Sequence, residues 1–360
     1  MAGYGGRVKP SLLALLAAAA LLSACTQTAY LGQSVGGHLS LMAAAQPVDK
    51  LLAQPELAAD LRERLLLSQQ LRAFSVEALK LPDNDSYRRY ADLGRQAAVW
   101  NVVATGELDL TLKTWCFPVM GCVGYRGYFK RADADAYAEQ LRGEGLEVLV
   151  YGVPAYSTLG WSNFVGGDPL LNTFIKYPAG ELAGMLFHEL AHQVAYAADD
   201  TQFNESFATL VERRGAEAWL QAQASPAERA AYGLRLQRRE QFRALTGAYR
   251  QRLAALYGKA LTDEAKRAAK AALLQEMRQD YARLKTEDWG GDAAYDGWFA
   301  RANNASFALL SAYSDLTPAF DALLARQGHD WPRFYAEVKR LAALPKDGRR
   351  TELLRENTGD

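Results

Sequence analysis

Residues 181–198 read Glu-Leu-Ala-Gly-Met-Leu-Phe-His-Glu-Leu-Ala-His-Gln-Val-Ala-Tyr-Ala-Ala. Almost every position is apolar, which is typical of a helix buried on all sides. Three polar side chains interrupt the run, at His188, Glu189 and His192. Positions four apart differ by about 40° around a helix, so both imidazoles project from one face, one turn apart. The spacing predicts two ligands to one Zn²⁺ ion, with Glu189 offset around the helix, where its carboxylate reaches a water beside the metal.

Chance is a poor explanation for this pattern. The chain has four histidines and 41 acidic residues among 360 positions, so a His-acid pair followed by a correctly spaced His is expected with a frequency of about 0.004. The alternative is a pair of core histidines with satisfied hydrogen bonds. The other two histidines, His38 and His329, follow glycines in expected loops, and we assign them no function.

A catalytic zinc site takes three protein ligands and leaves a fourth position for water. Twelve residues after the second histidine, residues 204–212 read Asn-Glu-Ser-Phe-Ala-Thr-Leu-Val-Glu, again apolar with isolated acids. A second buried helix therefore offers a carboxylate, and Glu205 is the expected third ligand. The alternatives are Asp199 and Asp200 on a polar turn, and Glu212 two turns further along. A third histidine of the metzincin type is excluded, because alanine occupies the positions that would carry its glycine and histidine.

Composition and charge restrict the class of protein. With 49% hydrophobic and 23% charged residues, the chain can bury a sizeable core, so a disordered chain is excluded. Lys plus Arg and Asp plus Glu each total 41, and no run of like charge forms a tail that binds polyanions. We therefore expect no nucleic-acid partner.

The amino terminus is typical of an export signal. Within residues 1–24, Arg7 and Lys9 form a basic region, and the apolar run at residues 12–22 follows it. A membrane-spanning helix needs about 20 apolar residues. The run is shorter than that, which favours a signal peptide.

Residues 22–25 read Leu-Ser-Ala-Cys and resemble the lipobox of bacterial lipoproteins. The resemblance implies cleavage before Cys25, acylation of that residue, and a stable lipid anchor in the membrane. The mature chain is then 25–360, lies in the cell envelope and faces the periplasm. Thr26, where inner-membrane lipoproteins of enterobacteria carry Asp, implies the outer membrane. The alternative is an ordinary signal peptide with an incidental cysteine.

Cys116 and Cys122 remain as an even pair in a turn-rich stretch, Trp-Cys-Phe-Pro-Val-Met-Gly-Cys at 115–122. In an oxidising compartment such a pair favours a local disulfide. A metal site at the two thiolates lacks a second cysteine pair or a nearby histidine to complete it.

Hydrophobic periodicity changes along the chain. Leucines at three- and four-residue steps predict two or three helices within residues 39–97, with Pro55 and Pro82 as helix starts. The runs Val99–Ala104 and Leu108–Leu112 flank Thr-Gly and predict a β-hairpin.

A helix near 132–142 and a third strand over Leu146–Val153 complete a small mid-sequence sheet. Ser-Pro-Ala-Glu at 225–228 is a strong helix start, from which we expect a helix to about Tyr257. A second helix over Thr262–Lys285 forms an antiparallel hairpin with it. This hairpin is either a solvated pair packed on the core or a lid or partner-docking arm.

The predicted fold is α+β, mostly helical, as a single domain over 25–360. Its expected segments are N-terminal helices at 39–97, a small sheet at 98–160, zinc-binding helices at 179–216, a helical hairpin at 226–286 and C-terminal helices at 292–345.

Two motifs carry a family resemblance. His-Glu-Leu-Ala-His at 188–192 followed by Asn-Glu-Ser-Phe-Ala-Thr at 204–209 resembles the gluzincins, and the second motif is similar to the Asn-Glu-Gly-Phe-Ala segment of M1 aminopeptidases. Together with the lipobox and the segments 115–118, 127–129 and 156–161, they make the whole chain similar to bacterial lipoproteins called predicted aminopeptidases. The resemblance implies a zincin-like catalytic domain.

The resemblance also implies zinc hydrolysis of a peptide substrate. Zn²⁺ held by His188, His192 and Glu205 lowers the pKa of a water, and Glu189 takes its proton and later gives it to the leaving amine. A tyrosine hydroxyl is the usual second electrophile, and Tyr313 is our candidate.

Departures from the relatives leave other roles open. The Gly-x-Met-Glu-Asn segment that holds a substrate amino terminus in M1 enzymes is absent, so Asp168 is the expected substitute. Thr209 replaces the Asp that supports the first histidine in thermolysin-like enzymes, so Asn204 or Glu212 takes that role. By resemblance, Thr158 lies on an edge strand that pairs with an extended peptide. A glycine-rich connecting loop is the alternative for that segment.

The leading hypothesis is a lipid-anchored zinc aminopeptidase. Its alternatives are an endopeptidase with the same mechanism, a zinc hydrolase of non-peptide substrates, and a non-catalytic envelope scaffold stabilised by zinc. Retention of Glu189 argues against the scaffold, because a structural site needs no base. The sequence identifies neither a specificity pocket nor an oligomeric state.

Overall fold

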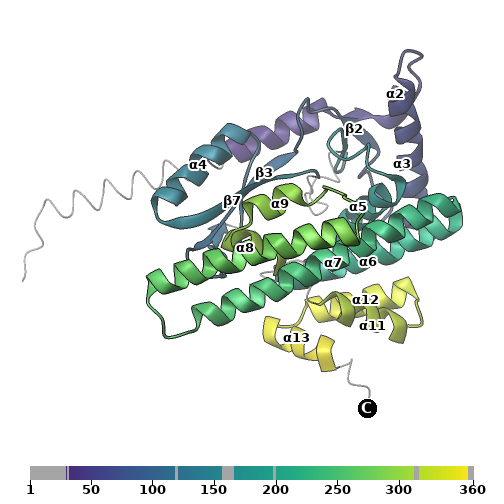
Figure 1. Ribbon diagram of the computed structural model, residues 1–360. Helices are drawn as coiled ribbons and strands as arrows, with labels where there is room; N and C mark the ends of the chain where they lie inside the picture. Colours follow the sequence, from purple (N-terminus) through teal and green to yellow (C-terminus); the bar gives the residue numbers. More distant parts are fainter. Residues whose placement is uncertain are drawn as a thin grey trace, which may run out of the picture.

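The computed structural model describes residues 30, 32–117, 121–155, 166–197, 200–311 and 316–355. Helices form most of this part of the chain, which confirms the expected α+β, mostly helical class (Figure 1). Besides a helical segment at residues 32–44, the described helices are α2 (Val48–Leu52), α3 (Ala59–Glu77), α4 (Arg131–Gly143), α5 (Ala179–His192), α6 (Thr201–Gln223), α7 (Pro226–Tyr257), α8 (Asp263–Glu287), α9 (Asp296–Arg301), α10 (Asn304–Ser311), α11 (Thr317–Arg326), α12 (Trp331–Ala342) and α13 (Lys346–Arg355).

The main sheet is centred on β3 (Val99–Gly106), with strand order β6-β3-β7. The partner β7 (Leu146–Val153) has the predicted bounds and pairs antiparallel with β3 along its whole length, from Val99 opposite Val153 to Gly106 opposite Leu146. On the other edge lies β6 (Arg126–Tyr128), also antiparallel. Helix α4 packs its buried alanines against this sheet, as amphipathic spacing requires.

The predicted hairpin partner of β3 is wrong. Residues 108–112 form no strand, because β6 and β7 already flank β3. Instead the Asp109 carboxylate accepts hydrogen bonds from the backbone N–H and the hydroxyl of Thr111 and turns the chain. Local β propensity could not reveal that strands from later in the sequence occupy both edges.

A second small sheet has the order β1-β2-β8, from Gln46–Pro47, Arg89–Ala91 and Leu170–Leu171. Strands β2 and β8 are parallel, so the loops that precede them lie side by side. The expectation that Pro82 begins a helix is wrong, because residues 82–88 form one of these loops.

Cys116 and Cys122 face one another across the hairpin of β4 (Trp115–Phe117) and β5 (Gly121–Val123), and a disulfide joins them. The predicted local disulfide is therefore confirmed.

Helices α5 and α6 form the centre of the largest hydrophobic core and run antiparallel. A Cβ atom added at Gly184 would lie 3.0 Å from Cγ of Glu212, and one added at Gly180 would lie 3.0 Å from Cδ1 of Leu220. The α5 glycines therefore permit a close helix approach that larger residues would prevent. On α5, Leu182, Leu186 and Leu190 are among the fully buried side chains.

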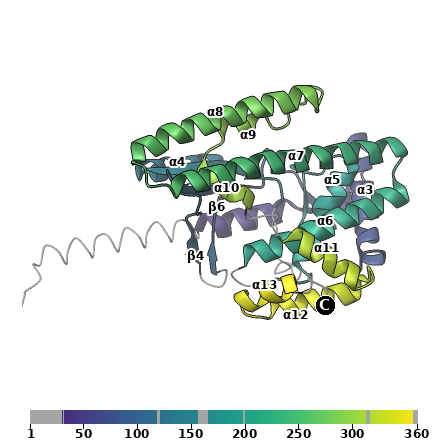
Figure 2. The same cartoon turned by 60° about the horizontal axis from the view of Figure 1, so that its bottom comes forward.

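Helices α7 and α8 lie side by side as the predicted antiparallel hairpin, and the two views show them across one face of the molecule (Figures 1 and 2). Ser225 and Glu228 form the expected capping box, and Thr262 caps α8. The Tyr249 hydroxyl donates to Asp280 and Arg252 pairs with Glu276 across the hairpin. An aromatic cluster beneath it, which includes Phe242, Tyr281, Trp289 and Phe299, packs the hairpin onto α9 and α10.

The C-terminal helices cover the opposite side of α6 (Figure 2). The ring of Phe320 on α11 contacts Phe203 and Phe207 on α6, with ring centroids 4.9 and 5.9 Å apart. Helix α6 thus lies between α5, α7 and the C-terminal helices. Among the described residues, no helix combines the length and apolar character needed to cross a membrane.

Candidate metal centre

Three side chains from α5 and α6 converge on one point. His188 and His192 lie one turn apart on α5, and Glu205 lies in the second turn of α6. The ligand atoms of these three residues all lie within 4.8 Å of one another, and within the described part of the chain this is the one such group of His, Cys, Asp or Glu side chains. The structure therefore brings the two predicted histidine ligands and the predicted carboxylate ligand together.

The separations fit a tetrahedral cation. The two Nε2 atoms are 3.2 Å apart, and Glu205 oxygens lie 3.3 Å from His188 Nε2 and 3.8 Å from His192 Nε2. Zinc bound to nitrogen and oxygen at its usual distances has ligands about 3.3 to 3.5 Å apart. The residues present therefore fit a zinc ion.

Glu212 bonds the ring nitrogen of His188 that faces away from the other two candidate ligands. Its Oε2 lies 3.1 Å from His188 Nδ1, so this ring nitrogen donates and Nε2 keeps its lone pair for the shared point. Glu212, and not Asn204, supports the histidine. Asn204 instead makes two hydrogen bonds to the backbone of Ala197 and closes the connection between α5 and α6.

The carboxylates set the charge of the two imidazoles. Burial lowers the pKa of His188, but its hydrogen bonds to Glu205 and Glu212 outweigh burial and raise that pKa well above the usual value. Burial lowers the pKa of His192 to about 4. Burial raises the pKa of Glu212, but the hydrogen bond from His188 and the charge of Arg239 bring it to about 2. The carboxylates on either side of His188 therefore favour a positive charge at this point, which a bound cation would supply.

Asp200, one of the alternative candidates for the third ligand, caps α6 and pairs with an arginine instead. Asp200 caps α6 by accepting from the N–H of Phe203, and its other oxygen lies 2.7 Å from Arg349 on α13, with both side chains 5% exposed. Asp200 therefore has other partners and is not in the group of candidate ligands. The remaining alternative on that turn, Asp199, lies outside the described residues.

Glu189 lies next to His188 on α5 and is not part of the ligand group. Burial raises the pKa of Tyr87, and the charges of Glu189 and Asp168 raise it further, so both carboxylates lie near this ring. Asp168 is fully buried, and its backbone oxygen accepts from the N–H of Tyr87 at 2.7 Å. Asp168, the expected amine-binding residue, and Glu189, the expected base, therefore both lie near Tyr87.

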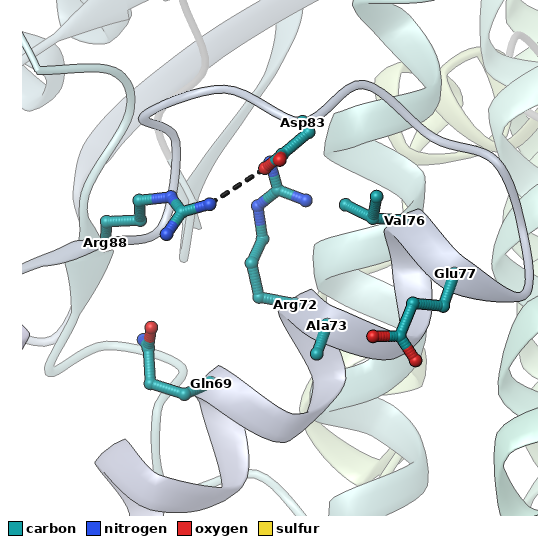
Figure 3. Close-up of a pocket in the computed structure, with 7 residues that line it drawn as sticks. All are labelled: Gln69, Arg72, Ala73, Val76, Glu77, Asp83 and Arg88. Carbon is teal, nitrogen blue, oxygen red and sulfur yellow. Dashed lines mark hydrogen bonds and ion pairs between the residues drawn. The ribbon is translucent and has the colours of Figure 1, made fainter.

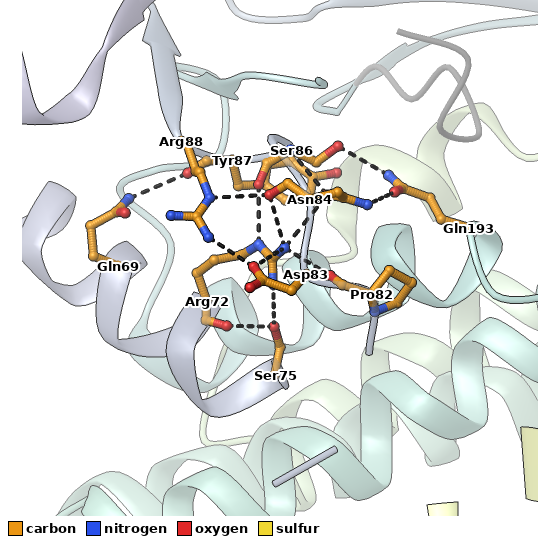
Figure 4. Close-up of polar contacts among 10 residues, drawn as sticks. All are labelled: Gln69, Arg72, Ser75, Pro82, Asp83, Asn84, Ser86, Tyr87, Arg88 and Gln193. Atoms are coloured by element: carbon orange, nitrogen blue, oxygen red, sulfur yellow. Dashed lines mark hydrogen bonds and ion pairs between the residues drawn. The ribbon is translucent and has the colours of Figure 1, made fainter. Parts of the chain in front are cut away.

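The loop at residues 82–88 lies beside Gln193 at the end of α5, as Figure 4 shows. Gln193, one residue after the second histidine, accepts from Asn84 at 2.6 Å and donates to Ser86 at 3.2 Å. From α3, buried Arg72 donates to carbonyl oxygens of the loop, including that of Ser86 at 3.2 Å. These bonds satisfy a loop backbone that belongs to no strand or helix.

Tyr87 itself has a backbone φ of 66°, a conformation that a bulky residue rarely adopts. Its hydroxyl is buried and has no hydrogen-bond partner among the described residues. Gly167 allows the neighbouring loop to approach, since a Cβ there would lie 2.3 Å from the Ser86 nitrogen. Strain of this kind is often found at functional sites, and no local sequence signal distinguishes Tyr87 from the other 17 tyrosines.

A cavity of about 190 Å³ lies beside the same loop (Figure 3). Its charged lining includes Arg72, Arg88, Asp83 and Glu77, and Asp83 pairs with Arg88 at 2.8 Å. None of the three candidate ligands lines it, so this cavity is separate from the metal centre.

Other expected site residues are not placed. Cys25, Thr158 and Tyr313 lie outside the described residues. The sequence did not single out Tyr125: burial raises the pKa of this tyrosine, and the charges of Tyr151 and Glu205 add to this effect.

The comparisons with known proteins give one match. A family model described as "Putative aminopeptidase" matches residues 29–354. No curated protein matches the chain, and neither does any solved structure.

Two carboxylates five residues apart should behave oppositely. Glu205→Ala should bind a metal far more weakly, because it removes one of the three candidate ligands. Asp200→Asn should keep the metal but unfold at a lower temperature, because Asn still caps the helix while the buried charge of Arg349 loses its partner. Elemental analysis and thermal unfolding measure the two effects. Equal metal content in the two variants would show that Glu205 is not a ligand.

Proposed function

The chain belongs to the family described as "Putative aminopeptidase", and on this premise we propose that it is a zinc metallopeptidase. The observation that carries the proposal is the convergence of His188, His192 and Glu205 within 4.8 Å. Two imidazoles and one carboxylate form the ligand set of catalytic zinc sites, which leave the fourth position open.

Exposure of the ligands supports a catalytic rather than a structural site. The side chains of His188 and Glu205 are 16% and 19% exposed, and that of His192 is 7% exposed. A structural zinc site closes its fourth position with a protein ligand. Partial exposure of two candidate ligands is compatible with access by a substrate.

When bound, Zn²⁺ polarises a substrate carbonyl and lowers the pKa of a water molecule to near neutrality. Glu189 then acts as the general base: it accepts a proton from the attacking water and returns it to the leaving amine. Glu212 keeps the Nδ1 proton of His188 and so directs Nε2 toward the shared point. Glu189 and Glu212 thus have different roles: one transfers a proton and the other orients His188.

Removal of an amino-terminal residue is the mode of cleavage that the family description favours. An aminopeptidase must pair the substrate ammonium with a carboxylate near the metal, because an unpaired buried charge costs several kcal/mol. Asp168 is our candidate for this role, because its charge and that of Glu189 both act on Tyr87.

A lipid anchor at Cys25 is the second part of the proposal. The Leu-Ser-Ala-Cys segment at 22–25 supports acylation there. The enzyme would then act in the periplasm on peptides close to the membrane, and Thr26 favours the outer membrane.

Glu189→Gln should retain the metal and abolish hydrolysis, because Gln has nearly the same shape but cannot accept the proton. We expect a loss of at least 10²-fold in kcat. Cleavage of a peptide mixture, followed by mass spectrometry with and without chelator, measures activity, and elemental analysis measures zinc. Activity near that of the wild type would refute the role of Glu189, and loss of zinc would show that the residue supports the metal instead.

Peptides with free amino termini should be cleaved, and their N-acetylated forms should be rejected. Asp168→Asn should remove this preference, because a neutral amide cannot pair with the ammonium. The measurement compares kcat/KM for matched free and acetylated peptides. Internal cleavage of acetylated peptides at comparable rates would identify an endopeptidase.

Cys25→Ser should release the protein from the membrane fraction, because serine cannot receive the thioether-linked lipid. Fractionation followed by a high-salt wash and immunoblotting tests this. A variant that still sediments with membranes after the wash must be held there by another segment.

A further inference from the structure

Helix α7 contacts α5 and α6, the two helices that carry the candidate ligands, through a row of ion pairs. Arg235 pairs with Glu181 at the start of α5, and one turn later Arg239 lies 3.1 Å from Glu212 on α6. The same face of α7 carries Glu240, which pairs with Arg213 at 2.6 Å. Helix α7 of the hairpin therefore contacts both α5 and α6, as expected for a pair packed on the core.

In one of these pairs, Arg239–Glu212, the glutamate also bonds the predicted ligand His188. The two oxygens of Glu212 have different partners: Oε1 lies 3.1 Å from a nitrogen of Arg239, and Oε2 lies 3.1 Å from Nδ1 of His188. Arg239, Glu212 and His188 thus form a continuous chain of hydrogen bonds from α7 through α6 to α5. The chain ends at the ring nitrogen opposite the one that faces the proposed metal.

The position of Glu212 is restricted on its other side as well. Its Cγ lies against the backbone of α5, where a Cβ at Gly184 would approach to 3.0 Å. The carboxylate can still rotate about its last bonds, and rotation would withdraw Oε2 from the imidazole. The guanidinium on Oε1 opposes this rotation, because a charge-assisted hydrogen bond fixes direction as well as distance.

We propose that Arg239 is a positioning residue for the metal centre, which acts through Glu212 on the orientation of His188. The helical hairpin thereby completes the metal site, although it supplies no ligand. The inference rests on the proposed function, because it requires that His188 binds a metal.

A surface ion pair of no consequence is the competing explanation. Arg239 is 32% exposed, and pairs of that kind contribute little to stability. The two explanations differ in what they predict for metal affinity. An ion pair that only joins two helices affects the stability of the fold alone. A residue that holds the carboxylate behind a metal-binding histidine should also affect metal affinity, by about 10- to 100-fold.

The test measures zinc affinity of the purified chain by competition with a chelator, together with the thermal unfolding of the metal-free protein. Arg239→Ala should weaken zinc binding about 10- to 100-fold, and Arg239→Lys should recover part of the loss. The matched control is Arg235→Ala, which removes an ion pair one turn away that does not lead to a histidine. This control should bind zinc as the wild type does, with a similar change in thermal stability.

A double-mutant cycle tests the route through Glu212. Glu212→Gln alone should weaken binding, and adding Arg239→Ala should weaken it little further, since the arginine acts through the carboxylate already removed. Wild-type affinity in Arg239→Ala, equal losses in Arg239→Ala and Arg235→Ala, or fully additive losses in the cycle would each overturn the inference. A wild-type chain that binds no zinc would refute the proposed function and this inference together, so the two failures are distinguishable.

Discussion

The close packing of α5 against α6 is the constraint on which the site depends. Two small residues on α5, Gly180 and Gly184, let the helices approach until Leu220 and Glu212 lie against the α5 backbone. Because the helices run antiparallel, this contact fixes their register. A shift of one residue on either helix would rotate its polar side chains by about 100° and separate the histidines from the carboxylate. The candidate metal centre is therefore a consequence of packing in the core.

Much of the fold could be predicted because its signals are local. The capping box at Ser225, the cap at Thr262 and the largely apolar pattern of residues 182–191 each depend on neighbours within a few positions. The strand Leu146–Val153 was predicted for the same reason. The convergence of Glu205 with the histidines was also accessible, since the two helices are consecutive and must turn back on one another.

What could not be predicted depends on distant partners. The β2–β8 pairing joins Tyr90 to Leu170 through only two residues on each strand, which is too short for a periodic signal. Residues 108–112 have β propensity but no free strand edge to join. The left-handed backbone at Tyr87 is maintained by partners 18 and 81 positions away in the sequence, Gln69 and Asp168. Such a conformation is the result of tertiary contacts, and no pattern around Tyr87 indicates it.

The connection between the two metal helices shows why distant parts of the chain matter to the site. This segment must reverse direction between the second histidine and Glu205, and turns of this kind are mobile unless their polar groups are bonded. At its start Gln193 binds the loop at residues 82–88, and near its middle Ala197 binds Asn204 through both backbone groups. At its end Asp200 pairs with Arg349 in a buried contact. Segments distant in the sequence, at residues 82–88 and at Arg349, therefore hold the connection between α5 and α6. A helix pair cut out of this protein would keep the sequence motif but lose the contacts that fix its geometry.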